Sequence, residues 1–291
     1  MLAQVIRSLK NDPGFMSAVS HWEVVPAREA KVVDFPEEID PRLLDSLKSK
    51  NIERLFSHQL CTYNNVVAGK HVVVVTPTAS GKTLAYNLPV LQTLLREKDA
   101  KAMYLFPTKA LSQDQQSELN EVLLDGKLPV DIFTYDGDTP RSIRNSAREQ
   151  GRVVITNPDM LHMGILPNHP KWIKFFKHLR FVVIDEIHTY RGVFGSHMTN
   201  LIRRLKRVAR FYGATPLFIC CSATIGNPKA LAEKILEEPV ELVDDNGAPA
   251  GERHFVLYNP PLVDPDRGQG IRRGGGEGIS SYCHPAAQSG H

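Results

Sequence analysis

The chain has 291 residues, of which 42% are hydrophobic and 23% charged, and its formal net charge is +3 from 35 basic and 32 acidic side chains. This is ordinary globular composition for one large domain or two smaller ones, and the charge is too mild to indicate a nucleic-acid partner by itself. No apolar run approaches the roughly 20 residues that span a bilayer and no signal-peptide pattern is present, so we expect a soluble, cytoplasmic protein with no membrane partner.

The N-terminal segment, residues 1–50, is predicted to be a short extension packed on the domain that follows it. Pro36 and Pro41 interrupt this segment, and Arg42–Lys50 is its helix candidate. Proline fixes its own backbone angle and lacks an N–H donor, so it is typical of the boundaries of helices.

From about residue 70 the chain alternates short β-branched runs with longer helical patterns. The strand candidates are His71–Val75, Ala102–Phe106, Val130–Thr134, Val153–Thr156, Phe181–Ile184 and Leu217–Cys221. The helix candidates lie near residues 82–97, 108–124, 140–150, 158–165, 196–212 and 227–237. Because the runs are almost continuously apolar, they fit strands that are buried on both faces of a parallel sheet. The pattern predicts a doubly wound α/β domain over residues 51–245, which would bind ligands at the carboxyl ends of its strands.

The C-terminal part of the chain changes in character after residue 240. Short strands are predicted at Val240–Val243 and His254–Tyr258, and residues 246–266 are expected to begin a linker to another domain. Residues 267–291 contain seven glycines and almost no large apolar side chains. Such a segment cannot bury enough surface to offset its chain entropy, so we expect it to be disordered.

The four cysteines, Cys61, Cys220, Cys221 and Cys283, include no CxxC pair and match no zinc-site spacing. Cys220 and Cys221 lie in an apolar strand candidate, where buried thiols are expected. This use of cysteine indicates a reducing compartment.

A phosphate-binding loop is predicted where the first strand of this domain meets its first helix. Strand His71–Val75 runs into Thr76-Pro77-Thr78-Ala79-Ser80-Gly81-Lys82-Thr83, and strand, GKT loop and helix is the context that such a loop requires. Its backbone N–H groups would face the phosphates, Lys82 would reach the β- and γ-phosphates, and the Thr83 hydroxyl would hold Mg²⁺. The match is imperfect, since Thr76 replaces the first glycine of the pattern and Ala79 stands where many such loops have glycine. The alternative is a chance GKT at the start of a helix.

Two adjacent acids follow the apolar strand Phe181–Ile184, in the run Asp185-Glu186-Ile187-His188. Parallel strands bring their carboxyl ends to one edge of the sheet, so these acids would lie beside the phosphate loop. We expect Asp185 to bind Mg²⁺, directly or through water, and Glu186 to orient and deprotonate the attacking water, so the predicted catalytic residues are Lys82, Asp185 and Glu186. The alternative is a pair of solvated acids at a helix start, and His188 alone would be typical of a packed or solvated histidine.

Together these segments resemble the ordered motifs of the DEAD/DEAH-box helicases of superfamily 2. The matching segments are Phe56–Gln59 (Q motif), Thr78–Thr83 (I), Phe106–Leu111 (Ia), Tyr135–Thr139 (the glycine-containing strand contact), Thr156–Leu161 (Ib), Asp185–His188 (II) and Ser222–Thr224 (III). The run DEIHTYRGVFGSHMTNLIRRLKR further resembles DNA-repair helicases of the mitomycin-repair type, which carry a cysteine-rich zinc-binding domain at the far C-terminus. The resemblance covers about residues 50–240 and implies the first RecA-like P-loop NTPase domain of a helicase that uses ATP and Mg²⁺.

The resemblance also implies roles for polar residues around the nucleotide. Gln59 would read the adenine edge and favour ATP over GTP, although a polar helix residue is the alternative. His188, Ser222 and Thr224 would couple the nucleotide site to strand movement. Ser222 and Thr224 could instead cap the helix that begins near Asn227.

Nucleic-acid binding is implied for residues at strand-to-helix turns, namely Pro107, Thr108, Lys109, Gly137, Thr156, Asn157 and Asp159. Such residues contact the sugar-phosphate backbone through hydroxyls, backbone N–H groups and helix N-termini, so they carry no sequence information. Thr108 and Asp159 could equally be helix N-caps. The implied partner is single-stranded or tailed duplex DNA with 3′→5′ translocation, and RNA stays open because backbone contacts do not disclose the sugar.

One helix candidate carries a cluster of basic side chains, Arg203, Arg204, Lys206, Arg207 and Arg210. Its apolar stripe consists of Leu201, Leu205, Val208 and Tyr212. A solvated basic face is the default interpretation, and a DNA contact is the alternative.

In this family ATP is held between two RecA-like domains, and the second supplies an arginine finger that is worth about 10³–10⁵ in turnover. After Asn259-Pro260-Pro261 the sequence continues into Ile271–Gly276 and a polar tail, where an apolar strand of that second domain is expected. Our hypothesis is a truncation or reading-frame change near residue 273, giving a chain that binds ATP weakly and does not unwind alone. A non-catalytic module that holds nucleic acid and uses ATP only as a conformational ligand is the alternative.

Overall fold

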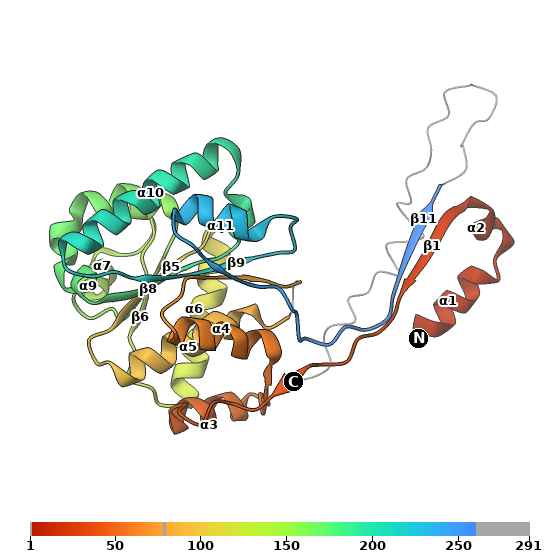
Figure 1. The fold of residues 1–291 in the computed structure, drawn as a ribbon, viewed down its shortest axis with the longest axis horizontal. Coiled ribbons are helices and arrows are strands. Elements are labelled where there is room, and N and C mark those ends of the chain that lie inside the picture. Colours follow the sequence, from red (N-terminus) through yellow and green to blue (C-terminus); the bar gives the residue numbers. More distant parts are fainter. Residues whose placement is uncertain (1, 78–79, 260–291) are drawn as a thin grey trace. The chain divides into compact units, whose positions relative to one another are not determined.

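The computed structural model describes residues 2–77 and 80–259 (Figure 1). They form two compact units, a larger one over Ala30–Ala248 and a smaller one that joins the chain up to Glu29 with the chain from Pro249. The expectations for Thr78, Ala79, Cys283 and residues 267–291 lie outside the described residues. Among those that are described, no helix has the length and apolarity needed to cross a bilayer.

The larger unit is built on a parallel sheet of seven strands within the described residues, in the order β10-β4-β9-β8-β5-β7-β6. The strands are β4 (Val72–Val75), β5 (Lys101–Leu105), β6 (Ile132–Thr134), β7 (Val153–Thr156), β8 (Leu179–Ile184), β9 (Leu217–Ser222) and β10 (Glu241–Val243). Every neighbouring pair runs parallel. The predicted fold class, a doubly wound α/β domain of the RecA-like type, is confirmed.

Helices cover both faces of this sheet, with α10 and α11 on one face and α4, α5 and α6 on the other (Figure 1). The helices of the larger unit are α3 (Pro41–Ser49), α4 (Ser57–Val67), α5 (Lys82–Arg96), α6 (Lys109–Asp125), α7 (Arg141–Glu149), α8 (Pro158–Met160), α9 (Ile173–Lys177), α10 (Gly192–Phe211) and α11 (Pro228–Leu236). Successive side chains of β4 enter two separate cores, since Val73 and Val75 face one and Val72 and Val74 the other. Burial on both faces explains why these strands are continuously apolar.

The helix predicted near residues 158–165 differs in the structure. Only α8 is α-helical, and it continues as a π turn over Leu161–Ile165 and a 3₁₀ segment over Leu166–Trp172. Pro167 and Pro170 lack backbone N–H donors and so prevent a regular α-helix from continuing here. Trp172 is fully buried at the end of this segment and anchors it to the core.

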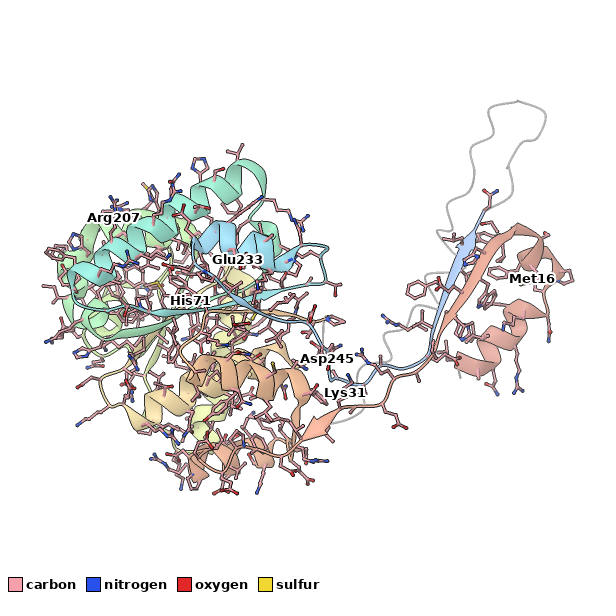
Figure 2. The ribbon with its side chains drawn as sticks, viewed as in Figure 1. Met16, Lys31, His71, Arg207, Glu233 and Asp245 are labelled. Carbon is pink, nitrogen blue, oxygen red and sulfur yellow. The ribbon has the colours of Figure 1, made fainter. Side chains whose placement is uncertain are left out.

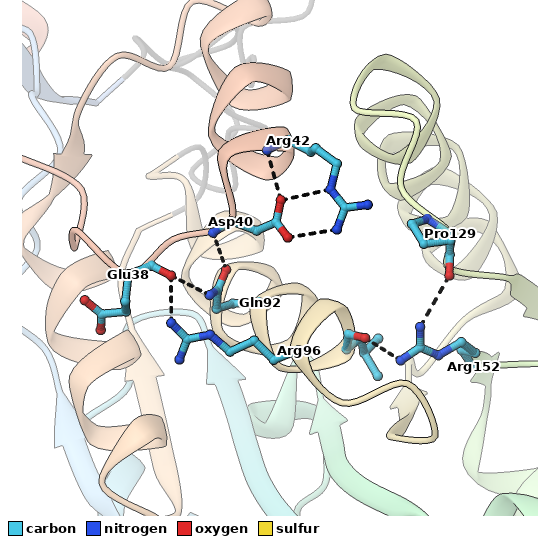
Figure 3. A network of polar contacts seen from close by, with 8 residues as sticks. Glu38, Asp40, Arg42, Gln92, Arg96, Pro129 and Arg152 are labelled. Carbon is cyan, nitrogen blue, oxygen red and sulfur yellow. Dashed lines mark hydrogen bonds and ion pairs between the residues drawn. The ribbon is translucent and has the colours of Figure 1, made fainter.

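The domain begins earlier than the predicted boundary at residue 51. Strand β2 (Val32–Val33) pairs with β3 (Leu55–Phe56), and Leu43 and Leu47 of α3 are buried in the same core as β4. Figure 3 shows how this segment is fixed to α5: the Gln92 amide accepts from the Asp40 N–H at 2.8 Å and donates to the Glu38 carbonyl at 2.8 Å. The chain from Ala30 onward therefore belongs to the domain, and the predicted extension of residues 1–50 is divided between the two units.

The smaller unit contains helices α1 (Leu2–Lys10) and α2 (Pro13–Ala18) and an antiparallel pair of strands, β1 (Val19–Val25) and β11 (Arg253–Tyr258). Trp22 Nε1 donates to His254 Nδ1 at 3.0 Å, and the rings of Phe15 and Tyr258 stack at 5.1 Å. The strand predicted at His254–Tyr258 is present. It lies within the predicted linker, residues 246–266, and pairs with a strand that the sequence did not predict.

Candidate functional site

Three adjacent strands, β4, β9 and β8, end at the same edge of the sheet. Val75 of β4 is paired with Ser222 of β9, and Ile184 of β8 is paired with Cys220 of β9. The phosphate loop that follows β4 and the acids that follow β8 therefore flank the end of β9. This is the edge at which parallel α/β sheets bind ligands.

The described part of the phosphate loop is tightly held. Ser80 Oγ donates to Thr76 Oγ1 at 2.6 Å, and both side chains are buried. Gly81 has a left-handed backbone with φ of 79°, which favours glycine, and α5 begins at the next residue. The half-buried Lys82 ammonium donates to the Ser222 carbonyl at 3.4 Å. Lys82 thus points across the end of β9 toward the acids.

Asp185 and Glu186 form a compact acidic turn at the end of β8. Glu186 has φ of 51°, which is unusual for a residue with a side chain, and its N–H donates to Asp185 Oδ1 at 2.8 Å. Burial raises the pKa of Asp185, and the Glu186 N–H bond and the nearby positive charge of Lys82 partly oppose this rise. The structure therefore places Lys82 close enough to Asp185 for their charges to interact, beside Glu186, while the catalytic roles of the three residues stay predictions.

His188 connects the acidic turn with the end of β9. Its Nδ1 lies 3.1 Å from Glu186 Oε2 and 3.3 Å from the Ala223 N–H. Nδ1 can accept from Ala223 only without a proton and can donate to Glu186 only with one, so the tautomer of the ring selects one contact. His188 thus lies between the two segments that it is expected to couple.

Ser222 and Thr224 take different positions after β9. Ser222 is fully buried and its hydroxyl donates to the Ala223 carbonyl at 2.8 Å, whereas Thr224 is exposed. The N-cap of α11 is Asn227 and receives no side-chain cap. The alternative that Ser222 and Thr224 cap this helix is therefore wrong.

Gln59 joins the Q motif to the phosphate loop. Its Oε1 accepts from the Phe56 N–H at 2.8 Å, and its Nε2 donates to the Gly81 carbonyl at 3.0 Å. Both ends of the amide are thus bonded within the protein, and the side chain is 3% exposed. Its adenine-reading role stays a prediction, while its contact with the loop is a structural fact.

The predicted nucleic-acid residues follow β5, β6 and β7 at the same carboxyl edge. Lys109 and Gly137 are exposed, and Lys109 forms an ion pair with Asp138. Thr108 Oγ1 accepts from the Leu111 N–H at 3.4 Å and Asn157 Oδ1 accepts from the Met160 N–H at 2.8 Å. These two are helix N-caps, so the N-cap alternative for Thr108 is present in the structure.

Thr156 is placed differently from its neighbours. Its side chain is 1% exposed, and its hydroxyl donates to the Tyr135 carbonyl at 2.6 Å. The hydroxyl is used to join β7 to the loop after β6, so it does not face a ligand. Pro107, Asn157 and Asp159 remain at the accessible edge, with Asp159 exposed.

A model of the DEAD/DEAH box helicases matches residues 56–231. The chain belongs to this family. It is 54% identical over 263 residues to the uncharacterized ATP-dependent helicase YprA of Bacillus subtilis, a match that covers 90% of this chain and 35% of the relative. It is also 38% identical over 269 residues to the ATP-dependent helicase HRQ1 of Saccharomyces cerevisiae, covering 90% of this chain and 24% of that protein.

Solved helicase structures share the fold of this family member. A crystal structure of the DUF1998 helicase MrfA bound to DNA matches with a TM-score of 0.89 and 53% identity, over 94% of this chain and 36% of that one. The DEAD-box helicase Mss116, bound to ssRNA and UDP-BeF, matches with a TM-score of 0.62 at 20% identity, which shows the fold alone. The resemblance to DEAD/DEAH-box helicases is confirmed, and the chain spans about a third of the length of YprA and MrfA.

Sequence reasoning missed two residues that shape the edge at which nucleic-acid contacts are predicted. Arg144 of α7 donates to the carbonyls of Asp136 and Gly137, each at 2.9 Å, and so fixes the loop around Gly137. Asp138 is the ion-pair partner of Lys109. The acid is visible within the matched motif, but Arg144 lies on the following helix and carries no local signal.

Gly81→Ala is expected to destabilise the domain and displace Gln59. A left-handed residue with a side chain costs roughly 1–2 kcal/mol, and a Cβ here would lie 2.6 Å from Gln59 Nε2. Denaturant unfolding should therefore show a lower free energy of unfolding. Gly226→Ala is the matched control, because the backbone of Gly226 has no positive φ and a Cβ there would lie in open space. Equal losses in both variants would contradict this account of the loop.

Asp185→Asn is expected to stabilise the domain at pH 7 while weakening its binding of magnesium nucleotide. Burial raises the folded pKa of Asp185 above its ordinary 3.8. The stability contributed by protonated Asp185 is therefore present at low pH and is lost as the pH rises through the folded pKa. Asparagine keeps the shape and the acceptor for the Glu186 N–H without the buried charge.

Thermal unfolding of wild type and Asp185→Asn at pH 7 and near pH 4 tests this prediction. The stabilisation should be larger at pH 7, and the exposed Asp114→Asn should show no such difference. A variant that is less stable than wild type at pH 7 would show that the carboxylate stabilises the fold.

Proposed function

We propose that this chain is the first RecA-like motor domain of an ATP-dependent DNA helicase that translocates 3′→5′ and acts in DNA repair. The observation that carries the proposal is the convergence of Lys82, Asp185 and Glu186 around the end of β9. Membership of the DEAD/DEAH box helicase family supports ATP use. Direction and repair role rest on the resemblance to the mitomycin-repair type.

The residues at this edge fit a magnesium nucleotide. Lys82 supplies a cation at the N-terminus of α5, where backbone N–H groups also favour phosphate. Thr83 and Asp185 offer a hydroxyl and a carboxylate, the hard oxygen ligands that Mg²⁺ prefers. When bound, Mg²⁺ would neutralise the charge that develops on the phosphates.

Side chains of the protein would bind the phosphates, accept the proton and couple the site to its surroundings. Lys82 binds and orients the phosphates, and Glu186 receives the proton of the attacking water. His188 contacts both Glu186 and Ala223, so a change at the nucleotide would move the Ser222–Ala223 segment through this histidine. Gln59 holds the Gly81 carbonyl and so keeps the loop in its left-handed turn.

Nucleic acid would lie across the carboxyl ends of β5, β6 and β7. Exposed Lys109, Gly137 and Asp159 occur there with the N-terminus of α6, and backbone contacts of this kind bind without reading sequence. MrfA has been crystallised bound to DNA, which supports DNA as the partner. A second RecA-like domain is the further partner that we propose.

The decisive experiment measures ATP hydrolysis with and without single-stranded DNA, for this chain and for a chain extended by the remainder of YprA. We expect DNA-stimulated hydrolysis in the extended chain and negligible hydrolysis in residues 1–291 alone. ATP binding without any stimulated hydrolysis in the extended chain would favour a non-catalytic module. Competition between DNA and RNA strands then decides the nucleic acid.

A further inference from the structure

A groove runs along α10 beside the loop that follows β7. Its walls include Pro158 and Asp159 from α8, just after that loop, and Phe194, Arg204 and Arg207 from α10. The groove is therefore continuous with the proposed backbone contact at Asn157–Asp159 but extends well beyond it. Phe194, Arg204 and Arg207 lie in the run that begins at Asp185, but they belong to none of the helicase motifs matched above.

The basic side chains of α10 divide into two groups. Arg203 is paired with Glu237, and Lys206 lies 2.9 Å from Glu238. Arg204 and Arg207, in contrast, have no acidic partner within the described ranges 2–77 and 80–259, although Arg204 Nη1 lies 3.4 Å from His162 Nδ1. Two guanidinium groups thus remain available to an external anion, and Arg207 is exposed on the outer side of α10 (Figure 2).

The available side chains lie along one broad side of the helix. His197 and Arg204 are seven residues apart and so lie almost in line, while Phe194 and Arg207 flank them, each roughly 60–80° around the helix axis at 3.6 residues per turn. All four line the groove, and Phe194 is 46% exposed. An aromatic ring at one end and two arginines without an acidic partner at the other span about 20 Å along the helix axis.

We propose that this groove binds a stretch of single-stranded nucleic acid that continues from the Asn157–Asp159 turn along α10. Arg204 and Arg207 contact phosphates, and Phe194 stacks on a base. A positively charged groove with an aromatic platform is the general solution for binding single strands without sequence preference. This inference rests on the proposed function, because it extends the strand that the motor domain is proposed to hold.

The chemistry of the groove favours nucleic acid over an acidic protein segment. The available cations are arginines, whose planar guanidinium groups match phosphate bidentately and stack on bases. Glu237 and Glu238 also line the groove, but their carboxylates are paired with Arg203 and Lys206. Continuity with the proposed backbone contact at Asp159 supplies the direction from which a strand would enter.

The test measures binding of fluorescein-labelled oligo(dT) to residues 1–291 by fluorescence anisotropy at several salt concentrations. For a strand on the order of 20 nucleotides, Arg204→Ala/Arg207→Ala should lose about tenfold in affinity, and the slope of log K against log salt should fall by about 1.4 for two phosphate contacts. For a strand of about 5 nucleotides the loss should be small. Phe194→Leu should weaken binding of the long strand without changing the salt slope.

The matched control is Lys174→Ala/Arg180→Ala, which removes two exposed positive charges that are paired with Glu149 and Glu97 away from the groove. Its affinity and salt slope should equal those of wild type. Equal binding of both strands by Arg204→Ala/Arg207→Ala and wild type overturns the groove proposal and leaves the proposed function standing. Failure of wild type to bind either strand overturns both. An equal loss in the control variant shows a general charge effect and overturns the groove as a site.

Discussion

Replacing Lys82 with alanine is expected to weaken ATP binding by on the order of 100-fold. The Lys82 ammonium makes no ion pair in the part of the chain that the structure describes, and it donates only weakly, at 3.4 Å, to the Ser222 carbonyl. It is therefore available to bind phosphate. A hydrogen bond to a charged group contributes about 1.5–3 kcal/mol, so the loss of one or two such bonds gives a change of this size.

Titration calorimetry with ATP and Mg²⁺ measures this change. Lys70→Ala is the matched control, because Lys70 is an exposed lysine paired with Glu241 at 3.0 Å. Both variants should unfold at temperatures close to that of wild type, since neither side chain is buried in a core. If Lys82→Ala binds ATP as tightly as Lys70→Ala, the phosphate-loop assignment is wrong.

The central sheet could be predicted because its strands carry their own signal. Val72–Val75 and Val153–Thr156 are buried on both faces, so every position is apolar or small, and no polar alternation blurs the pattern. The catalytic edge followed from the same fact. Once the strands are parallel, the residues after each strand must share one edge, and the order β4-β9-β8 then brings Lys82 close to Asp185.

Long-range pairings could not be predicted from local pattern. Strand β1 pairs with β11 more than 200 residues away, and its burial pattern along Val19–Val25 does not alternate. Such a ribbon has no local property that identifies its partner. The boundary at Ala30 depends on similar contacts, because Leu43 and Leu47 are recognised as core residues only once α3 is packed against α6.

The sequence also could not predict in which direction the side chains at the end of a strand point. Thr156 and Asn157 are adjacent and both polar, yet the first is buried on the Tyr135 carbonyl and the second caps α8. Alternation at the end of a strand decides which side chain faces inward. The motif match predicts that both residues bind nucleic acid, whereas in the structure one hydroxyl is buried and the other side chain caps a helix.

Glu186→Gln is expected to leave ATP affinity unchanged and to lower hydrolysis by about 10²–10⁴-fold, the usual contribution of a general base. Glutamine has nearly the same volume, but it cannot receive a proton. Its amide can still approach His188, whose Nδ1 lies 3.1 Å from Glu186 Oε2. Binding and chemistry should therefore separate in this variant, unlike in Lys82→Ala, where both are lost.

Hydrolysis is measured in the chain extended by the remainder of YprA, in the presence of single-stranded DNA, and affinity is measured in both forms. Glu233→Gln on α11 is the control, because it removes a half-buried carboxylate 4.0 Å from Lys229 and away from the phosphate loop. Undiminished hydrolysis by Glu186→Gln would assign proton transfer to a group other than Glu186. Buried Asp185 does not suit that role, because it accepts the Glu186 N–H and is predicted to bind the metal. A loss of affinity equal to the loss of hydrolysis would instead make Glu186 a binding residue.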